Sequence, residues 1–152
     1  MPLTKAAMIQ FTGHAEKAEN IAKAKTYIAE AVSNGASIVC LQELFNTIYF
    51  CYTENPDFWK LAEEIPGPTI DEMSKVPAEH RIVLVAPIYE KALKGELYNT
   101  AVVLGPDGQI MGKYRKSSTP LVKTASLIGN EKYYFKPGNL GFPVWQTPFG
   151  VN

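Results

Sequence analysis

Two short apolar runs with a helical pattern between them constrain the fold of this chain more than any other feature. Residues 6–11 and 37–41 are short enough for buried strands, and the second reads as a strand buried on both faces. Asn34-Gly35 supplies a helix stop between them. A strand, a helix and a strand in this order pair in parallel through a right-handed crossover. The helical pattern consists of apolar residues at spacings of three and four: Ile21, Ala24, Ile28, Ala31 and Val32. An α/β fold is therefore predicted.

A second helix and three more strands are predicted in the middle of the chain. Thr69-Ile70-Asp71-Glu72 has the spacing of a capping box and should start the helix, and Pro77 should kink or shorten it. A polar stretch at 89–96 suits a hairpin loop, and Gly105-Pro106-Asp107-Gly108 suits a tight turn. The three strands are expected at residues 81–88, 97–104 and 109–114.

The last third of the chain, residues 116–149, is rich in proline and glycine and should be mostly loop with short strands. A long structured loop inside a compact domain is usually functional. Two helices are too few to cover both faces of a sheet with this many strands. We therefore expect residues 1–152 to be one truncated domain.

The charge balance and the cysteine and histidine content exclude several function classes. Lysine plus arginine and aspartate plus glutamate number 15 each, which gives no electrostatic reason to expect nucleic acid or an anionic membrane as a partner. No apolar run approaches the ~20 residues of a membrane span, and the N-terminus lacks a secretory signal. Cys40 and Cys51 make no disulfide framework, and His14 and His80 leave a zinc site without ligands. A cytoplasmic chain that needs no metal is predicted.

Glu43 is the first candidate for chemistry because it directly follows the predicted strand 37–41. Ligands bind beyond the carboxyl ends of parallel strands in open α/β sheets, so Glu43 is placed where reacting groups collect. The alternative is a carboxylate that caps the next turn or pairs with a surface lysine.

Lys116 and Glu131 are weaker candidates when each is taken alone. Lys116 ends a cluster of cations at 113–116, which is usually a solvated edge, although one cation there could turn inward to stabilise negative charge on a substrate oxygen. Glu131 lies among aromatic residues in the long loop and could be an ordinary loop glutamate. Cys40 reads as a small buried hydrophobe, and Cys51 could line a pocket, but neither has a neighbouring histidine to activate it.

Several short motifs are distributed over essentially the whole chain. They are Gln42-Glu43-Leu44-Phe45-Asn46, Tyr98-Asn99-Thr100-Ala101-Val102-Val103, Gly112-Lys113-Tyr114-Arg115-Lys116 with Pro120, Glu131-Lys132-Tyr133-Tyr134-Phe135, Pro137-Gly138-Asn139 and Gly141-Phe142-Pro143. In order and in spacing, these motifs together resemble the nitrilase superfamily of carbon–nitrogen hydrolases. The aromatic loop 45–51 and the segment 131–135 look most like the N-carbamoylputrescine amidase and β-ureidopropionase branch.

The resemblance implies an αββα sandwich, of which this chain is the N-terminal half, and a Glu-Lys-Cys triad. Glu43 corresponds to the general base, Lys116 to the charge-stabilising lysine and Glu131 to the supporting glutamate. Tyr49 or Phe50 is expected to wall the substrate pocket. The nucleophilic cysteine would lie a few residues beyond the end of this chain. The resemblance implies no cofactor and no metal, and it leads us to expect a homo-oligomer in the full-length form.

The predicted activity of the complete protein is hydrolysis of a C–N bond in a small N-carbamoyl amine or linear amide. Two alternatives stay open: a truncated, non-catalytic interaction domain that pairs with a full-length subunit, and a nitrilase acting on C≡N. The chain departs from the family at Ser117-Ser118-Thr119, where histidine and an aliphatic residue usually precede the proline, so details of the pocket do not carry over.

The resemblance makes a geometric prediction. The charged ends of Glu43 and Lys116 should lie within roughly 3–6 Å of each other on one rim of the sheet. The end of the chain, Phe149 to Asn152, should point toward the same rim. One apolar face of the sheet should be uncovered.

Overall fold

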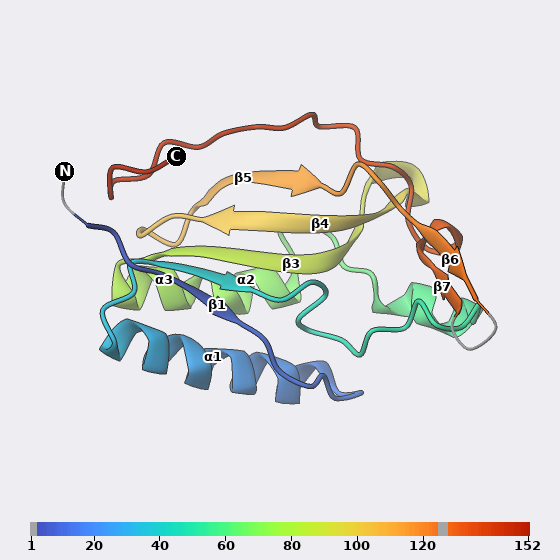
Figure 1. The fold of residues 1–152 in the computed structure, drawn as a ribbon, viewed down its shortest axis with the longest axis horizontal. Coiled ribbons are helices and arrows are strands. Elements are labelled where there is room, and N and C mark those ends of the chain that lie inside the picture. Colours follow the sequence, from blue (N-terminus) through green and yellow to red (C-terminus); the bar gives the residue numbers. More distant parts are fainter. Residues whose placement is uncertain (1–2, 125–127) are drawn as a thin grey trace.

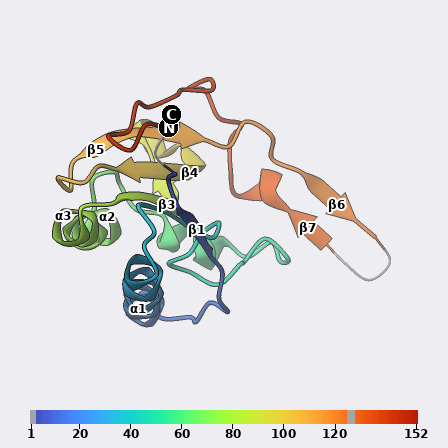
Figure 2. The same ribbon diagram turned by 60° about the vertical axis from the view of Figure 1, so that its left-hand side comes forward.

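The computed structural model describes residues 3–124 and 128–152. A central sheet has the strand order β1-β2-β3-β4-β5, and β6 and β7 form a separate hairpin that projects away from it (Figure 2). The strands are β1 (Ala6–Ile9), β2 (Ile38–Leu41), β3 (Val83–Lys91), β4 (Leu97–Leu104), β5 (Ile110–Arg115), β6 (Leu121–Lys123) and β7 (Ile128–Asn130). The helices are α1 (Lys17–Ser33), α2 (Pro68–Met73) and α3 (Lys75–His80), with short 3-10 turns η1 (Pro56–Leu61), η2 (Leu93–Gly95) and η3 (Glu131–Tyr133).

The predicted α/β start is confirmed. β1, β2 and β3 are parallel, with Ala6 opposite Ile38 and Ile38 opposite Val83, and α1 makes the crossover between the first two strands. β3, β4 and β5 continue as an antiparallel meander. The parallel strands therefore end at one rim of the sheet, and β5, which runs in the same direction as β3, ends there too.

All three α-helices pack on the same face of the sheet (Figure 1). Ala24 and Ile28 of α1 are fully buried against Val39 and Leu41 of β2, which explains the apolar spacing of the helix. The expectation that β2 is buried on both faces is wrong. Its other two residues, Ile38 and Cys40, point away from the helices and are only partly buried.

The second helix differs from the predicted capping box. It starts at Pro68, whose missing N–H and preset φ suit the first helical position, so Gly67 takes the capping place. The Thr69 backbone and hydroxyl instead donate to Glu63 at 2.8 Å each. The predicted effect of Pro77 is confirmed, because the helix breaks into α2 and α3, and Pro77 lies in the first turn of α3, where its missing N–H is tolerated.

The second face of the sheet is less open than expected, since residues 139–152 run across it (Figure 1). The indole of Trp145 lies against Gly112 so closely that a Cβ there would stand 2.2 Å from Nε1, and the Thr4 hydroxyl donates to the Phe149 carbonyl at 2.8 Å. An apolar hollow of about 460 Å³ remains between this segment and the sheet. Phe142 and Val144 are largely exposed. The prediction of an uncovered face is therefore correct only in part.

Candidate active site

Glu43 stands at the carboxyl end of β2, where the chain turns sharply away from the sheet. The next residue, Leu44, has φ +52°, a left-handed conformation that is uncommon for a side chain with Cβ. Its side chain is nevertheless fully buried, and the Phe45 N–H donates to the Pro87 carbonyl at 3.2 Å. Packing of Leu44 and Phe45 thus holds a strained turn that directs Glu43 outward.

Lys116 directly follows β5, and two backbone hydrogen bonds fix its position. Its N–H donates to the Asn99 carbonyl at 2.9 Å, which extends the ladder with β4 by one residue, and its carbonyl accepts from the Gly138 N–H at 2.8 Å. Glu131 begins η3, and its N–H donates to the Pro120 carbonyl at 3.1 Å. Three segments that are distant in sequence therefore meet at this rim.

The Lys116 ammonium lies between two carboxylates. Its Nζ is 2.8 Å from Glu43 Oε1 and 2.8 Å from each oxygen of Glu131. Glu131 is almost fully buried, whereas Glu43 is about two-fifths exposed. Burial by itself would lower the pKa of Lys116, but the hydrogen bonds with Glu131 and Glu43 outweigh it and raise the pKa above its usual value. The lysine is therefore charged, and the expected proximity of Glu43 and Lys116 is found.

Tyr49 and Phe50 are neighbours in sequence but have different environments. The Tyr49 hydroxyl donates to Glu131 Oε1 at 3.1 Å, and burial, with the charge of Glu131, raises the pKa of the phenol well above its usual value. Phe50 is 2% exposed and lies in an aromatic cluster behind the site. Its ring supports the loop from within; the cluster also contains Leu44, Cys51, Tyr89, Tyr134 and Phe135.

A hollow of about 480 Å³ opens beside the carboxylates. Gln42, Glu43, Tyr49 and Glu131 contribute to its wall, and the two strands of the projecting hairpin close one side. Its full lining is Gln10, Gln42, Glu43, Tyr49, Tyr52, Pro120, Val122, Gly129 and Glu131. Tyr49 therefore lies where the sequence placed it, although contact with a substrate stays a prediction.

Neither cysteine of the chain has the properties of a nucleophile. Cys51 is fully buried, and burial, followed by the negative charge of Glu131, raises the pKa of its thiol to about 12. Burial also raises the pKa of Cys40. Both thiols are thus protonated near neutral pH. Within residues 3–124 and 128–152, no cluster of three or more histidine, cysteine, aspartate or glutamate side chains is arranged to hold a metal ion.

Asn99 is a site residue that the sequence reasoning missed. Its Nδ2 donates to Glu43 Oε1 at 2.7 Å, and its side chain is almost fully buried. The signal was available in the Tyr98-Asn99-Thr100 motif, because a polar amide in the middle of an apolar strand needs a buried partner.

The last residues of the chain run back toward the rim at which β2 ends, as expected, but they do not lie at that rim. Residues 149–152 lie at the end of the sheet where β2 and β3 begin, beside Thr4, Ile38 and Val83 (Figure 1). The reason is that residues 139–147 run back along the whole second face. A turn with Gly150 at φ +76° then reverses the chain.

Among the described residues, no helix is long and apolar enough to cross a membrane. The α/β sheet carries a lysine between two carboxylates near the carboxyl ends of its strands, an arrangement that is typical of a ligand or active site in α/β proteins.

Residues 5–152 match the carbon-nitrogen hydrolase family. A citrullinase from Francisella tularensis is 38% identical over 147 residues, which cover 95% of this chain and 49% of that protein. An N-carbamoylputrescine amidase from Arabidopsis thaliana is 37% identical over 142 residues, or 93% of this chain and 46% of that protein. The solved structure of a carbon-nitrogen hydrolase from Helicobacter pylori G27 superimposes with a TM-score of 0.84 at 33% identity, covering 95% of this chain and 48% of that one.

The chain therefore belongs to the carbon–nitrogen hydrolases of the nitrilase superfamily. It spans about half the length of the curated relatives it matches.

Proposed function

We propose that, in the complete protein, this chain supplies the base and the charge-stabilising groups for hydrolysis of a C–N bond in a linear amide or an N-carbamoyl amine. The nucleophile would be a cysteine outside residues 1–152. The observation that carries the proposal is the Lys116 ammonium 2.8 Å from both Glu43 and Glu131. The catalytic roles of these three residues are part of the proposal.

Each group has a step that suits its position. Glu43, the more exposed carboxylate, would take the thiol proton, and the thiolate would form a C–S bond with the carbonyl or carbamoyl carbon. Lys116 and a backbone N–H would stabilise the oxyanion that forms. The amine or ammonia would leave with the proton from Glu43. Glu43 would then take a proton from water, the oxygen of that water would form a C–O bond with the carbon as the C–S bond breaks, and Glu43 would return the proton to the sulfur to regenerate the free thiol.

Glu131 suits a supporting role rather than proton transfer. It is almost fully buried, and its Oε1 already accepts hydrogen bonds from Lys116 and Tyr49. Its Oε2 contacts Lys116 as an ion pair and accepts no hydrogen bond among the described residues.

The relatives support the same substrate class. A citrullinase and an N-carbamoylputrescine amidase are named for small substrates that carry a carbamoyl group. The hollow beside Glu43 and Glu131, at about 480 Å³, is of a size suited to a small molecule. A cytoplasmic location and a homo-oligomeric full-length protein stay predictions.

The test is to express the complete coding sequence and to measure product release from an N-carbamoyl amine, a linear amide and a nitrile. We expect turnover of one of the first two, and its loss in Glu43→Gln and after thiol alkylation. Residues 1–152 alone should be inactive. Turnover of the nitrile alone would support the nitrilase alternative. A complete protein that lacks a further cysteine, shows no turnover and co-purifies with a full-length subunit would support the interaction domain.

A further inference from the structure

Three consecutive residues of β4, Tyr98, Asn99 and Thr100, connect the two faces of the sheet. Successive side chains of a strand point to opposite faces, so Tyr98 and Thr100 point to the helix side and Asn99 to the side of Glu43 and Lys116. All three are buried and contact charged groups. The proposed mechanism uses none of them.

Asn99 contacts both Glu43 and Lys116. Its side-chain Nδ2 donates to Glu43 Oε1 at 2.7 Å, and its backbone carbonyl accepts from the Lys116 N–H at 2.9 Å. Only 5% of its surface is exposed. Because a buried amide is held by its partners, its position fixes the distance between the carboxylate and the lysine backbone.

The two hydrogen bonds to Glu43 reach the same oxygen. Asn99 Nδ2 and Lys116 Nζ both contact Oε1, at 2.7 and 2.8 Å. Oε2 accepts no hydrogen bond within the described residues, although it belongs to the same carboxylate. Two donors stabilise charge on Oε1 and occupy its lone pairs, so Oε2 is the oxygen that can accept a proton.

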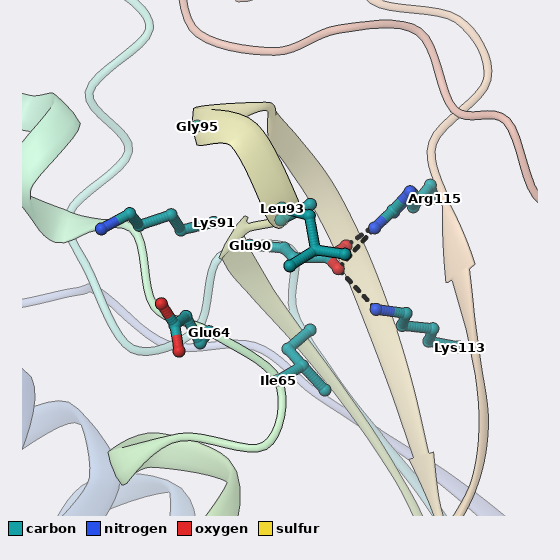
Figure 3. Close-up of a pocket in the computed structure, with 9 residues that line it drawn as sticks. Glu64, Ile65, Glu90, Lys91, Leu93, Gly95, Lys113 and Arg115 are labelled. Carbon is teal, nitrogen blue, oxygen red and sulfur yellow. Dashed lines mark hydrogen bonds and ion pairs between the residues drawn. The ribbon is translucent and has the colours of Figure 1, made fainter.

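Asn99 is itself held from the far face of the sheet. The Tyr98 ring stacks on the Arg115 guanidinium, with 3.9 Å from Cζ to the ring centroid. The Thr100 hydroxyl donates to Glu90 Oε2 at 2.6 Å, and Glu90 in turn binds Arg115. Figure 3 shows the Glu90 carboxylate between Arg115 and Lys113. Contacts on both sides of Asn99 therefore fix the backbone of β4 at this point.

We propose that Asn99 is a positioning residue for Glu43, which locks the carboxylate with Oε1 toward Lys116 and leaves Oε2 to accept the thiol proton. This inference rests on the proposed function. In the step itself, the S–H bond breaks, its electron pair stays on sulfur as the thiolate, and the proton forms an O–H bond with Oε2. No oxidant or further reactant is needed.

The decisive variant is Asn99→Asp in the complete protein. It keeps the shape of the side chain but replaces the donor with a carboxylate oxygen that faces Glu43 Oε1. The other titratable groups facing Glu43 are Lys116, Glu131, Tyr49 and Cys51; the last two stay neutral near pH 7 because burial raises the pKa of each. Two carboxylates in contact share a proton. We therefore expect the acid limb of the pH profile of kcat/KM, where activity falls as the pH is lowered, to move up by roughly one to two pH units.

A second variant removes the donor without adding a charge. Asn99→Ala should lower kcat by roughly 10- to 100-fold, because a hydrogen bond to an ionised group is lost, and should leave KM nearly unchanged. This variant also keeps the proposal testable if the aspartate variant does not fold.

The matched control for Asn99→Asp is Asn55→Asp, which adds the same charge but keeps the side-chain oxygen that accepts from the Asp57 N–H at 3.0 Å.

The outcomes separate this inference from the proposed function. If the complete wild-type protein is inactive, or if its activity persists in Glu43→Gln, the proposed function is overturned and this inference with it. If the wild type is active and Glu43→Gln abolishes that activity, the proposed function stands. If both folded Asn99 variants then keep the kcat and the acid limb of the wild type, only the positioning role is overturned. A lower kcat in Asn99→Asp without a shift of the acid limb also overturns the positioning role, since that pattern marks a structural defect.

Discussion

Arg115 and Lys116 are adjacent in sequence, yet their side chains bind carboxylates on opposite faces of the sheet. Arg115 binds Glu90 through two nitrogens, at 2.7 and 2.8 Å, on the helix side. Lys116 binds Glu43 and Glu131 on the other side. The alternation of side chains at the end of β5 thus separates a buried ion-pair network from the candidate site. Because Arg115 is anchored, the backbone from which Lys116 projects is anchored as well.

The first prediction concerns Lys116→Met in the complete protein. Removal of the ammonium leaves Glu43 and Glu131 without their shared cation and removes a donor to the oxyanion. We expect kcat/KM to fall by at least ~10²–10³-fold. The matched control is Lys136→Met, because Lys136 forms an exposed ion pair with Glu96. Steady-state kinetics check both variants, and equal effects of the two would count against a role for Lys116 in the reaction.

The second prediction concerns Glu90 and acid stability. Burial by itself raises the pKa of Glu90, but hydrogen bonds from Arg115, Lys113 and Thr100 outweigh it and lower the pKa to about 2. A lowered pKa in the folded state means that the stabilisation is present above the unfolded value of ~4.3 and is lost as the pH falls toward 2. The free energy of unfolding should therefore fall by on the order of 3 kcal/mol across this range because of Glu90.

Glu90→Gln tests that expectation. It should flatten the pH dependence below pH 4.5 and lower the free energy of unfolding at pH 7 by roughly 3–5 kcal/mol, because two cations lose their buried partner. Glu72→Gln is the matched control, since Glu72 binds two lysines at the surface and should matter much less. Urea unfolding at several pH values measures both, and an unchanged slope in Glu90→Gln would contradict the assignment.

The sequence was sufficient for those parts of the fold that local patterns determine. The spacing of Ala24 and Ile28 predicts the buried face of α1, and the missing N–H of Pro77 predicts the break between α2 and α3. The proximity of Glu43 and Lys116 also follows, because both stand at strand ends on the same rim. The motif resemblance selected these two from the many charged residues of the chain.

Other features depend on tertiary contacts that no local pattern reports. Thr69 has the spacing of a cap, but Glu63, six residues earlier, captures its N–H and hydroxyl, and Pro68 starts the helix instead. Phe50 lies in an aromatic loop whose sequence does not show which ring faces the core. Asn99 could be placed beside Glu43 only once the register of β4 against β3 was known.

A third prediction concerns Gly138, which packs against the strand end that carries Lys116. A Cβ at Gly138 would lie 2.0 Å from the Arg115 carbonyl oxygen, so the backbone there must shift in Gly138→Ala. We expect a loss of roughly 1–3 kcal/mol in the free energy of unfolding, together with a lower kcat, because Lys116 moves with its neighbour.

Gly129→Ala is the stability control for that variant. Its Cβ would meet no atom closer than 3.9 Å, so the free energy of unfolding should stay nearly unchanged. Urea unfolding and kinetics on the same preparations give both quantities. If Gly138→Ala proves as stable and as active as the wild type, the close approach of residue 138 to Arg115 does not hold the strand end in place.

The last prediction separates the two aromatic residues proposed to wall the pocket. The Tyr49 hydroxyl bonds Glu131 at 3.1 Å and its ring is partly exposed, whereas Phe50 is buried. Tyr49→Phe removes only the hydroxyl, so it should change kcat or KM and leave the melting temperature nearly unchanged. Phe50→Ala opens a cavity in the aromatic cluster and should lower the free energy of unfolding by roughly 3–5 kcal/mol. At a temperature where both variants are folded, KM should respond more to Tyr49→Phe. The opposite pattern, with KM altered mainly by Phe50→Ala and stability mainly by Tyr49→Phe, would place Phe50 against the substrate and give Tyr49 a structural role.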